Sequence, residues 1–192
     1  MDSMSKESST TPDTSFDVII VGAGFSGIYM LYRMVNLGLK VRLLEEASGA
    51  GGTWYWNRYP GARCDIESME YSYSFSEQLQ QEWKWTDKYS SGPEILEYAK
   101  HVVERFDLSR FIAFDSRVAT ATYDENETTW DIELETGQRY HARYCVMATG
   151  TLSSVNAPDL SVMLMVSSPS PPYISSLPLP VVMVSSPVCA NM

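Results

Sequence analysis

The sequence predicts an α/β fold in which a parallel sheet carries an inserted antiparallel β-meander. An apolar, β-branched run at residues 16–21 leads straight into a glycine-rich turn, a helical pattern and a second apolar run at 41–44. Further along, several segments with strand character are separated by turn residues. The order strand, glycines, helix, strand indicates a Rossmann-like β-α-β unit, and a length of 192 residues suits one domain.

The first strand is expected at residues 16–21, because FDVIIV is apolar enough to be buried on both faces of a sheet. A helix is expected from Phe25 to Leu37, and Gly38 is a typical C-terminal stop. The second strand, at 41–44, ends at Glu45. The apolar residues that mark the helix face, at spacings of three and four, are Ile28, Leu31, Tyr32 and Val35.

The aromatic segment at 54–73 has no clean period, so we expect loop there, with one helical turn near Glu67. A second helix begins at Gly92-Pro93, where the missing N–H of proline costs nothing, and is expected to pack on the sheet. Its apolar face consists of Ile95, Ala99, Val102, Val103 and Phe106.

The second half of the chain predicts strands, which are expected at residues 111–114, 117–123, 129–134 and 139–147. The turn residues at 124–126 and 136–137 favour an antiparallel meander. The last strand runs into Ala148-Thr149-Gly150, whose small residues allow a close approach of backbone to a ligand.

Composition divides the chain into three parts. Residues 1–15 are rich in Ser and Thr, lack the apolar core of a secretory signal and are expected to be a disordered leader. Residues 16–159 form the predicted domain. Residues 160–192 contain no charged side chain and are rich in Ser, Pro, Val and Met, which predicts an irregular low-complexity tail.

Charge and hydropathy exclude several classes of partner. A net charge of −10 and an isoelectric point near 4.6 disfavour nucleic acid and anionic membrane surfaces, and no apolar run approaches the roughly twenty residues of a membrane span. The three cysteines fit neither a zinc site nor a disulfide framework, and neither His101 nor His141 has a second metal ligand at a suitable spacing. We therefore expect a cytoplasmic protein with a small-molecule partner and no metal.

The glycine-rich turn, GAGFSG, has the spacing of a dinucleotide-binding fingerprint. Gly22 allows the tight turn, Gly24 lets the backbone approach a pyrophosphate, and Gly27 lets the helix lie close to the strand. The N–H groups at the helix start, including those of Phe25 and Ser26, then face the phosphate. Glu45 is placed to bind ribose hydroxyls. The alternative to dinucleotide binding is a coincidental glycine turn. Because FAD and NAD share their adenosine half, the fingerprint alone does not distinguish these two dinucleotides.

The run GGTWYWNRYPGARCD, at residues 51–65, favours FAD. With the continuation IESMEYSYSFS, the EWKW and GPEILEYAKHVVERFDL stretches and CVMATG, it resembles the FAD domain of the Baeyer–Villiger monooxygenases, flavoproteins of the cyclohexanone and phenylacetone monooxygenase type. The resemblance covers about residues 17–159.

The resemblance implies a set of FAD-binding residues. The ADP half would lie on Gly22–Gly27 and Glu45, and the flavin would lie above an aromatic bed. The residues implied for the flavin half, for the nicotinamide cofactor and for backbone contacts with FAD are Thr53, Trp54, Tyr55, Trp56, Arg63, Cys64, Asp65, Ile66, Tyr71, Val118 and Gly150. Flat aromatic rings offer stacking area, although ordinary core packing also explains Trp54 and Trp56.

The resemblance also implies a reaction. In this family NADPH reduces the flavin, oxygen adds to give a C4a-peroxyflavin, and the peroxide converts a ketone into an ester or lactone. Asp65 would be the catalytic residue, as the partner of an arginine that stabilises developing negative charge. A turn-capping aspartate is the alternative.

The pattern of the family stops after TLSSVNAPDL. Its members continue with an FxGxxxHxxxWP-like motif and a second GxGxxG domain, which binds NADPH and brings the arginine, and neither is present here. We therefore expect a truncated FAD-binding half that is inactive alone. One alternative is a non-catalytic flavin-binding or interaction remnant that associates with a longer homologue, and another is a simple NAD-binding Rossmann protein.

Overall fold

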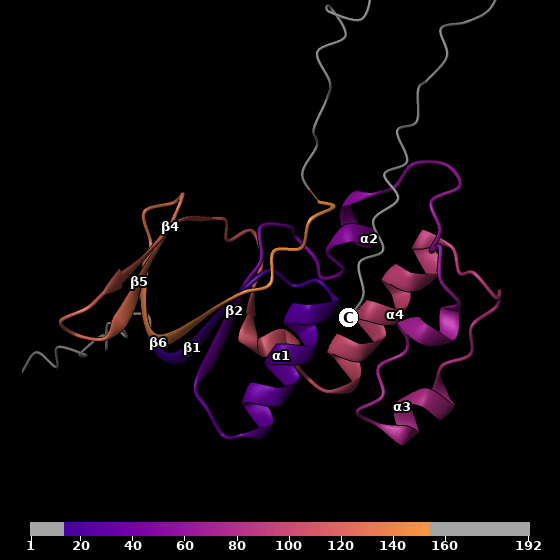
Figure 1. Ribbon diagram of the computed structural model, residues 1–192, viewed down its shortest axis with the longest axis horizontal. Coiled ribbons are helices and arrows are strands. Elements are labelled where there is room, and N and C mark those ends of the chain that lie inside the picture. The colour runs from indigo at the N-terminus through magenta and orange to yellow at the C-terminus, as the bar shows by residue number, and fades with distance from the viewer. Residues whose placement is uncertain (1–13, 154–192) are drawn as a thin grey trace, which may run out of the picture. The chain divides into compact units, whose positions relative to one another are not determined.

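A six-stranded mixed sheet in the order β3-β2-β1-β6-β5-β4 lies at the centre of the computed structural model, which describes residues 14–153 (Figure 1). The strands β1, β2, β3 and β6 run parallel, and β4, β5 and β6 form an antiparallel meander. Their bounds are β1 Ser15–Val21, β2 Val41–Leu44, β3 Ile112–Ala113, β4 Val118–Asp124, β5 Thr129–Leu134 and β6 Arg139–Met147.

The strand β6 joins the two halves of this sheet. One of its edges pairs with β1 in parallel, with Val18 opposite Tyr144, and its other edge pairs with β5 in antiparallel fashion. The parallel sheet and the meander are therefore one continuous sheet. The predicted fold class, α/β with a parallel sheet and an inserted meander, is confirmed.

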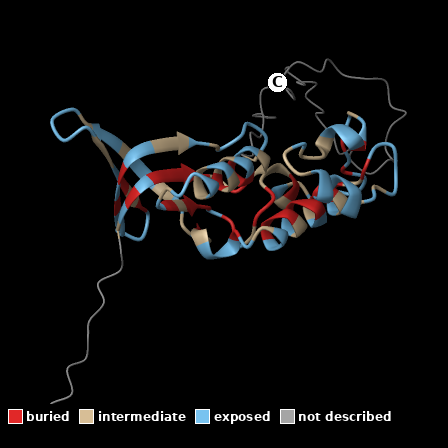
Figure 2. Cartoon of the chain, turned by 90° about the horizontal axis from the view of Figure 1, so that it is seen from below, coloured by how far each residue is buried: buried red, intermediate tan, exposed pale blue. Residues whose placement is uncertain are grey.

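The helices gather on one side of the parallel strands, with α1 beside the sheet and α4 next to α1 (Figure 1). Buried side chains of both helices join Val18 and Ile20 of β1 in one apolar cluster. Figure 2 shows this buried layer between helices and strands. The helical elements are α1 Phe25–Asn36, α2 Thr53–Trp56, α3 Glu77–Glu82 and α4 Gly92–Arg105, with short 3-10 turns at Ser68–Tyr71 and Ser109–Phe111.

A second apolar cluster joins β1 to the meander. Alternate residues of β1, Ile19 and Val21, lie in this cluster with Ile132, Leu134 and Tyr140 of β5 and β6. Because side chains alternate across a strand, β1 contributes to both clusters and is buried along nearly its whole length.

Several boundaries differ from the sequence expectation. Ser15, assigned to the leader, is the first residue of β1, and the strand expected at 111–114 is reduced to Ile112–Ala113. The aromatic segment contains α2 as well as the turn near Glu67. The predicted second helix is present: it contacts α1 and α2, and its buried side chains share one apolar cluster with Val18 and Ile20 of the sheet.

The helix α3 has no counterpart in the sequence prediction. Its sequence, EQLQQE, offers a single buried apolar side chain, that of Leu79, and hence no periodic face. The Ser76 hydroxyl caps this helix by accepting a hydrogen bond from the Leu79 N–H. A local cap therefore replaces the missing pattern.

The expected tail at 160–192, the end of the domain at 154–159 and most of the leader lie outside the described residues. The residues from 14 to 153 all fall within one compact unit. Among them, no helix combines the length and the apolar character of a membrane span.

Candidate functional site

The glycine turn between β1 and α1 is packed so closely that two of its glycines are required by the protein itself. Gly22 has φ of +104°, and a Cβ there would lie 2.5 Å from the carbonyl oxygen of Ala148. A Cβ on Gly27 would lie 1.8 Å from the carbonyl oxygen of Gly22. Any side chain at either position would therefore force the turn, the helix or β6 apart.

Gly24 differs from its two neighbours in the fingerprint. Its φ of −77° is ordinary for any residue, and a Cβ there would lie 3.6 Å from the Cα of Gly52, which is normal contact. As the N-cap of α1 it provides no side-chain acceptor. The first-turn N–H groups of α1, at Phe25, Ser26 and Gly27, therefore lack the side-chain cap that Ser or Asp would provide.

A second pair of glycines lies directly against this turn. A Cβ on Gly52 would lie 2.7 Å from the Cα of Gly24, and the N–H of Gly51 donates to the carbonyl of Ala23 over 2.9 Å. The sequence presented these two glycines only as the start of the aromatic motif. In the structure they bring the segment at 51–56 onto the fingerprint.

A third loop, after β6, completes the arrangement. The N–H of Ala148 donates to the carbonyl of Val21 over 2.8 Å, and the following residues lead to Gly150, which is exposed with φ of +66°. The three loops follow β1, β2 and β6 at the carboxyl ends of parallel strands, where open α/β sheets bind their ligands. Gly150 thus follows, by two residues, Ala148, whose carbonyl lies against Gly22 of the fingerprint.

Glu45 links two of these loops. Its carboxylate accepts hydrogen bonds from the N–H of Ala23 (2.5 Å) and from the N–H of Ala47 (2.8 Å), and the residue is 5% exposed. A carboxylate has about four acceptor positions, so two remain for the predicted ribose contact. That contact stays a prediction. The hydrogen bond from the Ala23 N–H shows that Glu45 also holds the glycine turn in place, a role that the sequence did not indicate.

The aromatic motif contacts the fingerprint through Phe25. The ring of Tyr71 meets Phe25 edge to face at 5.4 Å and meets Trp54 edge to face at 5.7 Å between centroids. Trp54 is buried with Cys64 and Ile95 in a small apolar cluster. Core packing therefore accounts for Trp54, and the same packing sets its ring beside the glycine turn.

The other residues of α2 are more accessible. Thr53 and Tyr55 are half-buried, and the Tyr55 hydroxyl lies 2.6 Å from the Ser48 Oγ. Trp56 is 44% exposed, so it is no core residue. Of the two tryptophans implied by the resemblance, the exposed one has surface available for a ligand.

The C-terminal end of the aromatic motif, residues 51–65, presents charged residues to solvent. Arg63 and Asp65 are exposed on either side of the buried Cys64, and Ile66 is half-buried. The Arg63 guanidinium donates to the carbonyl of Tyr89 over 2.8 Å. Arg63, Cys64 and Asp65 therefore lie on one short segment, in which the Cys64 side chain is buried in one cluster with Trp54.

Val118, the first residue of β4, is half-buried near the loop after β2. Two residues earlier, the N–H of Ser116 donates to the carbonyl of Glu45 over 2.8 Å, and the side chain of Arg117 pairs with Glu46 at 3.1 Å. The structure thus brings the segment before Val118 to Glu45 and Glu46, and the backbone contact of Val118 with FAD stays a prediction.

Tyr73 fastens the aromatic segment to the start of α1. Its hydroxyl donates to the carbonyl of Phe25 over 2.5 Å, and its N–H donates to the Tyr98 hydroxyl over 2.8 Å. Burial, with Tyr98 nearby, raises the pKa of Tyr73 well above its ordinary value. Its proton is therefore retained, and the hydroxyl remains a donor.

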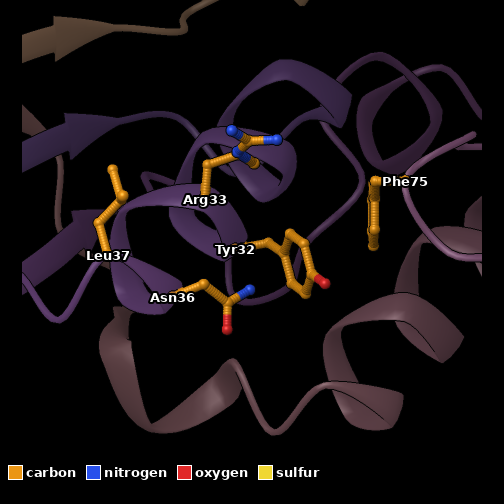
Figure 3. Close-up of a pocket in the computed structure, with 5 residues that line it drawn as sticks. All are labelled: Tyr32, Arg33, Asn36, Leu37 and Phe75. Carbon is orange, nitrogen blue, oxygen red and sulfur yellow. The ribbon is translucent and has the colours of Figure 1, made fainter.

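A surface hollow lies at the other end of α1, lined by Tyr32, Arg33, Asn36, Leu37 and Phe75 (Figure 3). None of these is a predicted site residue. Tyr32, Arg33 and Asn36 lie in the second half of α1, Leu37 caps its C-terminus, and Phe75 comes from the segment before α3. Within residues 14–153, no three His, Cys, Asp or Glu side chains are grouped to hold a metal ion.

Known proteins match both the sequence and this fold. Residues 20–82 match the model of an NAD(P)-binding Rossmann-like domain. The chain is 46% identical over 148 residues to a phenazine N-monooxygenase from Lysobacter antibioticus, covering 77% of this chain and 27% of that protein. It is 42% identical over 153 residues to a Baeyer–Villiger monooxygenase from Pseudooceanicola batsensis, covering 79% and 28%.

Solved structures of monooxygenases also match this chain. A steroid monooxygenase bound to NADP matches with a TM-score of 0.73 and 54% identity, and a cyclohexanone monooxygenase from Rhodococcus sp. Phi1 bound to NADP+ matches with 0.74 and 47%. Each match covers 76% of this chain and 28% of the other. The chain thus spans little more than a quarter of the relatives that it matches. Over about three quarters of its own length, it is homologous to part of the Baeyer–Villiger monooxygenases.

Proposed function

We propose that residues 16–159 form an FAD-binding domain of a Baeyer–Villiger-type monooxygenase. The observation that carries this proposal is the contrast among the fingerprint glycines. The protein's own packing requires Gly22 and Gly27, whereas neither conformation nor contacts require a glycine at 24. A residue that lacks a side chain without structural need, at an uncapped helix start, suits a ligand that approaches the backbone.

The residues present fit the cofactor. The N–H groups at the start of α1 would bind the pyrophosphate, and Glu45 would accept hydrogen bonds from a ribose. Trp54, Tyr71 and Phe25 form a packed aromatic wall that would exclude water from one side of the flavin. Bound FAD, reduced by NADPH, would supply the oxygen-transfer chemistry that converts a ketone into an ester or lactone.

Asp65 would contribute a fixed negative charge. Its exposed side chain, which follows Arg63 and the buried Cys64 and precedes Ile66 in the sequence, would hold a cationic group in place. In the proposed reaction that group is an arginine from another domain, which would stabilise negative charge on the reacting oxygen. The role of this chain's own residue is to orient the arginine.

The names of the relatives support the cofactors and a ketone substrate. One matched structure is a complex with FAD and NADP, and other matched proteins are named cyclohexanone, cyclopentanone and acetone monooxygenases. The phenazine N-monooxygenase supports a second candidate, oxygen transfer to a ring nitrogen. An NAD-binding Rossmann domain is a weaker candidate, supported by the family model.

The visible spectrum of the purified 192-residue chain tests the proposal. We expect FAD to bind and to remain with the protein through gel filtration, with its absorbance bands shifted from those of free FAD. Binding of NAD or NADPH without retained flavin would instead support the simple NAD-binding protein. FAD that binds but is not reduced by NADPH would identify a non-catalytic flavin-binding chain. Co-purification of this chain with a longer homologue would support the interaction remnant.

A further inference from the structure

We propose that Ser68 and Ser90 are positioning residues for Asp65. Two segments define the arrangement: the strap, residues 62–68, which carries Asp65, and the ledge, residues 87–92, on which the strap lies. The part of the inference that concerns flavin rests on the proposed function. The part that concerns the position of Asp65 does not.

Backbone hydrogen bonds attach the strap to the ledge at three places, and Arg63 faces Ser91 in an antiparallel bridge. Asp65 lies between the second and the third attachment. The bonds run from Gly92 N–H to Ala62 O (2.7 Å), from Cys64 N–H to Ser90 O (3.0 Å) and from Ser68 N–H to Lys88 O (2.8 Å).

The two serine hydroxyls form the buried centre of this contact. The Ser68 Oγ lies 2.7 Å from the carbonyl oxygen of Asp87, 3.0 Å from that of Lys88 and 2.7 Å from the Ser90 Oγ. Carbonyl oxygens only accept, so Ser68 donates its one proton to them and Ser90 donates to Ser68. Ser68 is 2% and Ser90 0% exposed, so water cannot replace either partner without opening the contact.

The strap is fixed on both sides of Asp65. On one side, the Cys64 side chain is buried against Trp54 and Ile95. On the other side, the Ser68 hydroxyl and N–H both bond to the ledge. Because the backbone is held on both sides of Asp65, its exposed carboxylate is confined to a small region, which lowers the cost of pairing it with the proposed arginine.

Hydrogen exchange of the full 192-residue chain tests the positioning. We expect Ser68→Ala and Ser90→Ala to speed exchange of the strap amides at Cys64 and Ser68 about tenfold, because the strap can then open locally. The matched control is Ser116→Ala, which removes another hydroxyl bonded to a carbonyl, that of Phe114, and should leave the strap unchanged. Unchanged strap exchange in folded serine variants would overturn the proposal.

A variant that does not fold is replaced by Ser68→Cys, which keeps the site filled while weakening the hydrogen bonds. The expected acceleration is then smaller but still confined to the strap. Acceleration spread evenly over β1, α1 and the strap would show a general loss of stability and would count against positioning.

The flavin midpoint potential separates positioning from mere support of the fold. Asp65→Asn removes a negative charge and should raise the potential of bound FAD. We expect Ser68→Ala to shift it in the same direction and to add no further shift in the Asp65→Asn background. Equal shifts in both backgrounds would refute the link to Asp65. If the unmodified chain retains no FAD, the proposed function fails, and the exchange experiment alone decides the positioning.

Discussion

Substitution of Gly24 by alanine separates the demands of the fold from those of the cofactor. The new methyl group would meet nothing closer than the Gly52 Cα at 3.6 Å, and φ of −77° is compatible with alanine. Stability should therefore change by no more than about 1 kcal/mol, the usual size of a glycine-to-alanine effect at a compatible position. The variant should fold with α1 intact.

The same methyl group would stand where a pyrophosphate must approach the start of α1. Losing one hydrogen bond to a charged group costs about 1.5–3 kcal/mol, which corresponds to a rise in the Kd for FAD of roughly 10- to 140-fold. Titration of the apo chain followed by flavin fluorescence measures this ratio, and thermal unfolding measures stability in the same sample.

Gly27→Ala is the matched contrast. Its Cβ would lie 1.8 Å from the carbonyl oxygen of Gly22, so this variant should lose stability before binding can be considered. A folded Gly24→Ala variant that binds FAD as tightly as the unmodified chain would refute the assignment of Gly24 to the pyrophosphate. Loss of folding in Gly24→Ala would refute the argument that the fold does not need this glycine.

Two further outcomes follow from buried and turn hydrogen bonds. Tyr73→Phe removes the hydrogen bond from its hydroxyl to the carbonyl of Phe25, so urea unfolding should show a loss of about 0.5–1.5 kcal/mol, and an unchanged midpoint would contradict that bond. Asp124 accepts hydrogen bonds from the N–H groups of Asn126 and Glu127, which lower its pKa. Asp124→Ala should therefore lower the thermal midpoint at pH 7, and the difference should shrink as the pH falls below about 3.9 through the lowered pKa, whereas a constant difference would exclude the charge as its cause.

Local pattern was sufficient for the β1-α1-β2 unit and for the last two strands. The strands expected at 129–134 and 139–147 have the observed bounds of β5, Thr129–Leu134, and β6, Arg139–Met147. Gly38, which was expected to stop the first helix, has a positive φ and follows the end of α1. These elements are set by nearest neighbours along the chain, so a single sequence carries the information. The helix α3 depends on the Ser76 cap and has no apolar period that predicts it. The pairing of β6 with β1 joins strands more than a hundred residues apart, which no local pattern can indicate.

The candidate site shows the same division. Gly22, Gly24 and Gly27 could be recognised from their spacing, but the close approach of Gly52 to Gly24 joins residues from two different loops. Likewise, Glu45 was predicted to face a ligand because it ends the second strand. Its bond to Ala23 N–H depends on how tightly the glycine turn folds back, which spacing alone does not determine.

Gly92 connects the aromatic bed with the segment that carries Asp65. Its N–H donates to the carbonyl of Ala62, the first residue of the strap, and a Cβ there would lie 3.2 Å from the Trp54 Cε3 and 3.3 Å from that same carbonyl oxygen. One glycine at the start of α4 thus sets the distance between Trp54 and the strap. Because interiors are closely packed, a side chain at position 92 would press on both Trp54 and the carbonyl of Ala62, so the spacing between the aromatic bed and the strap depends on α4 as well as on the motif that contains them both.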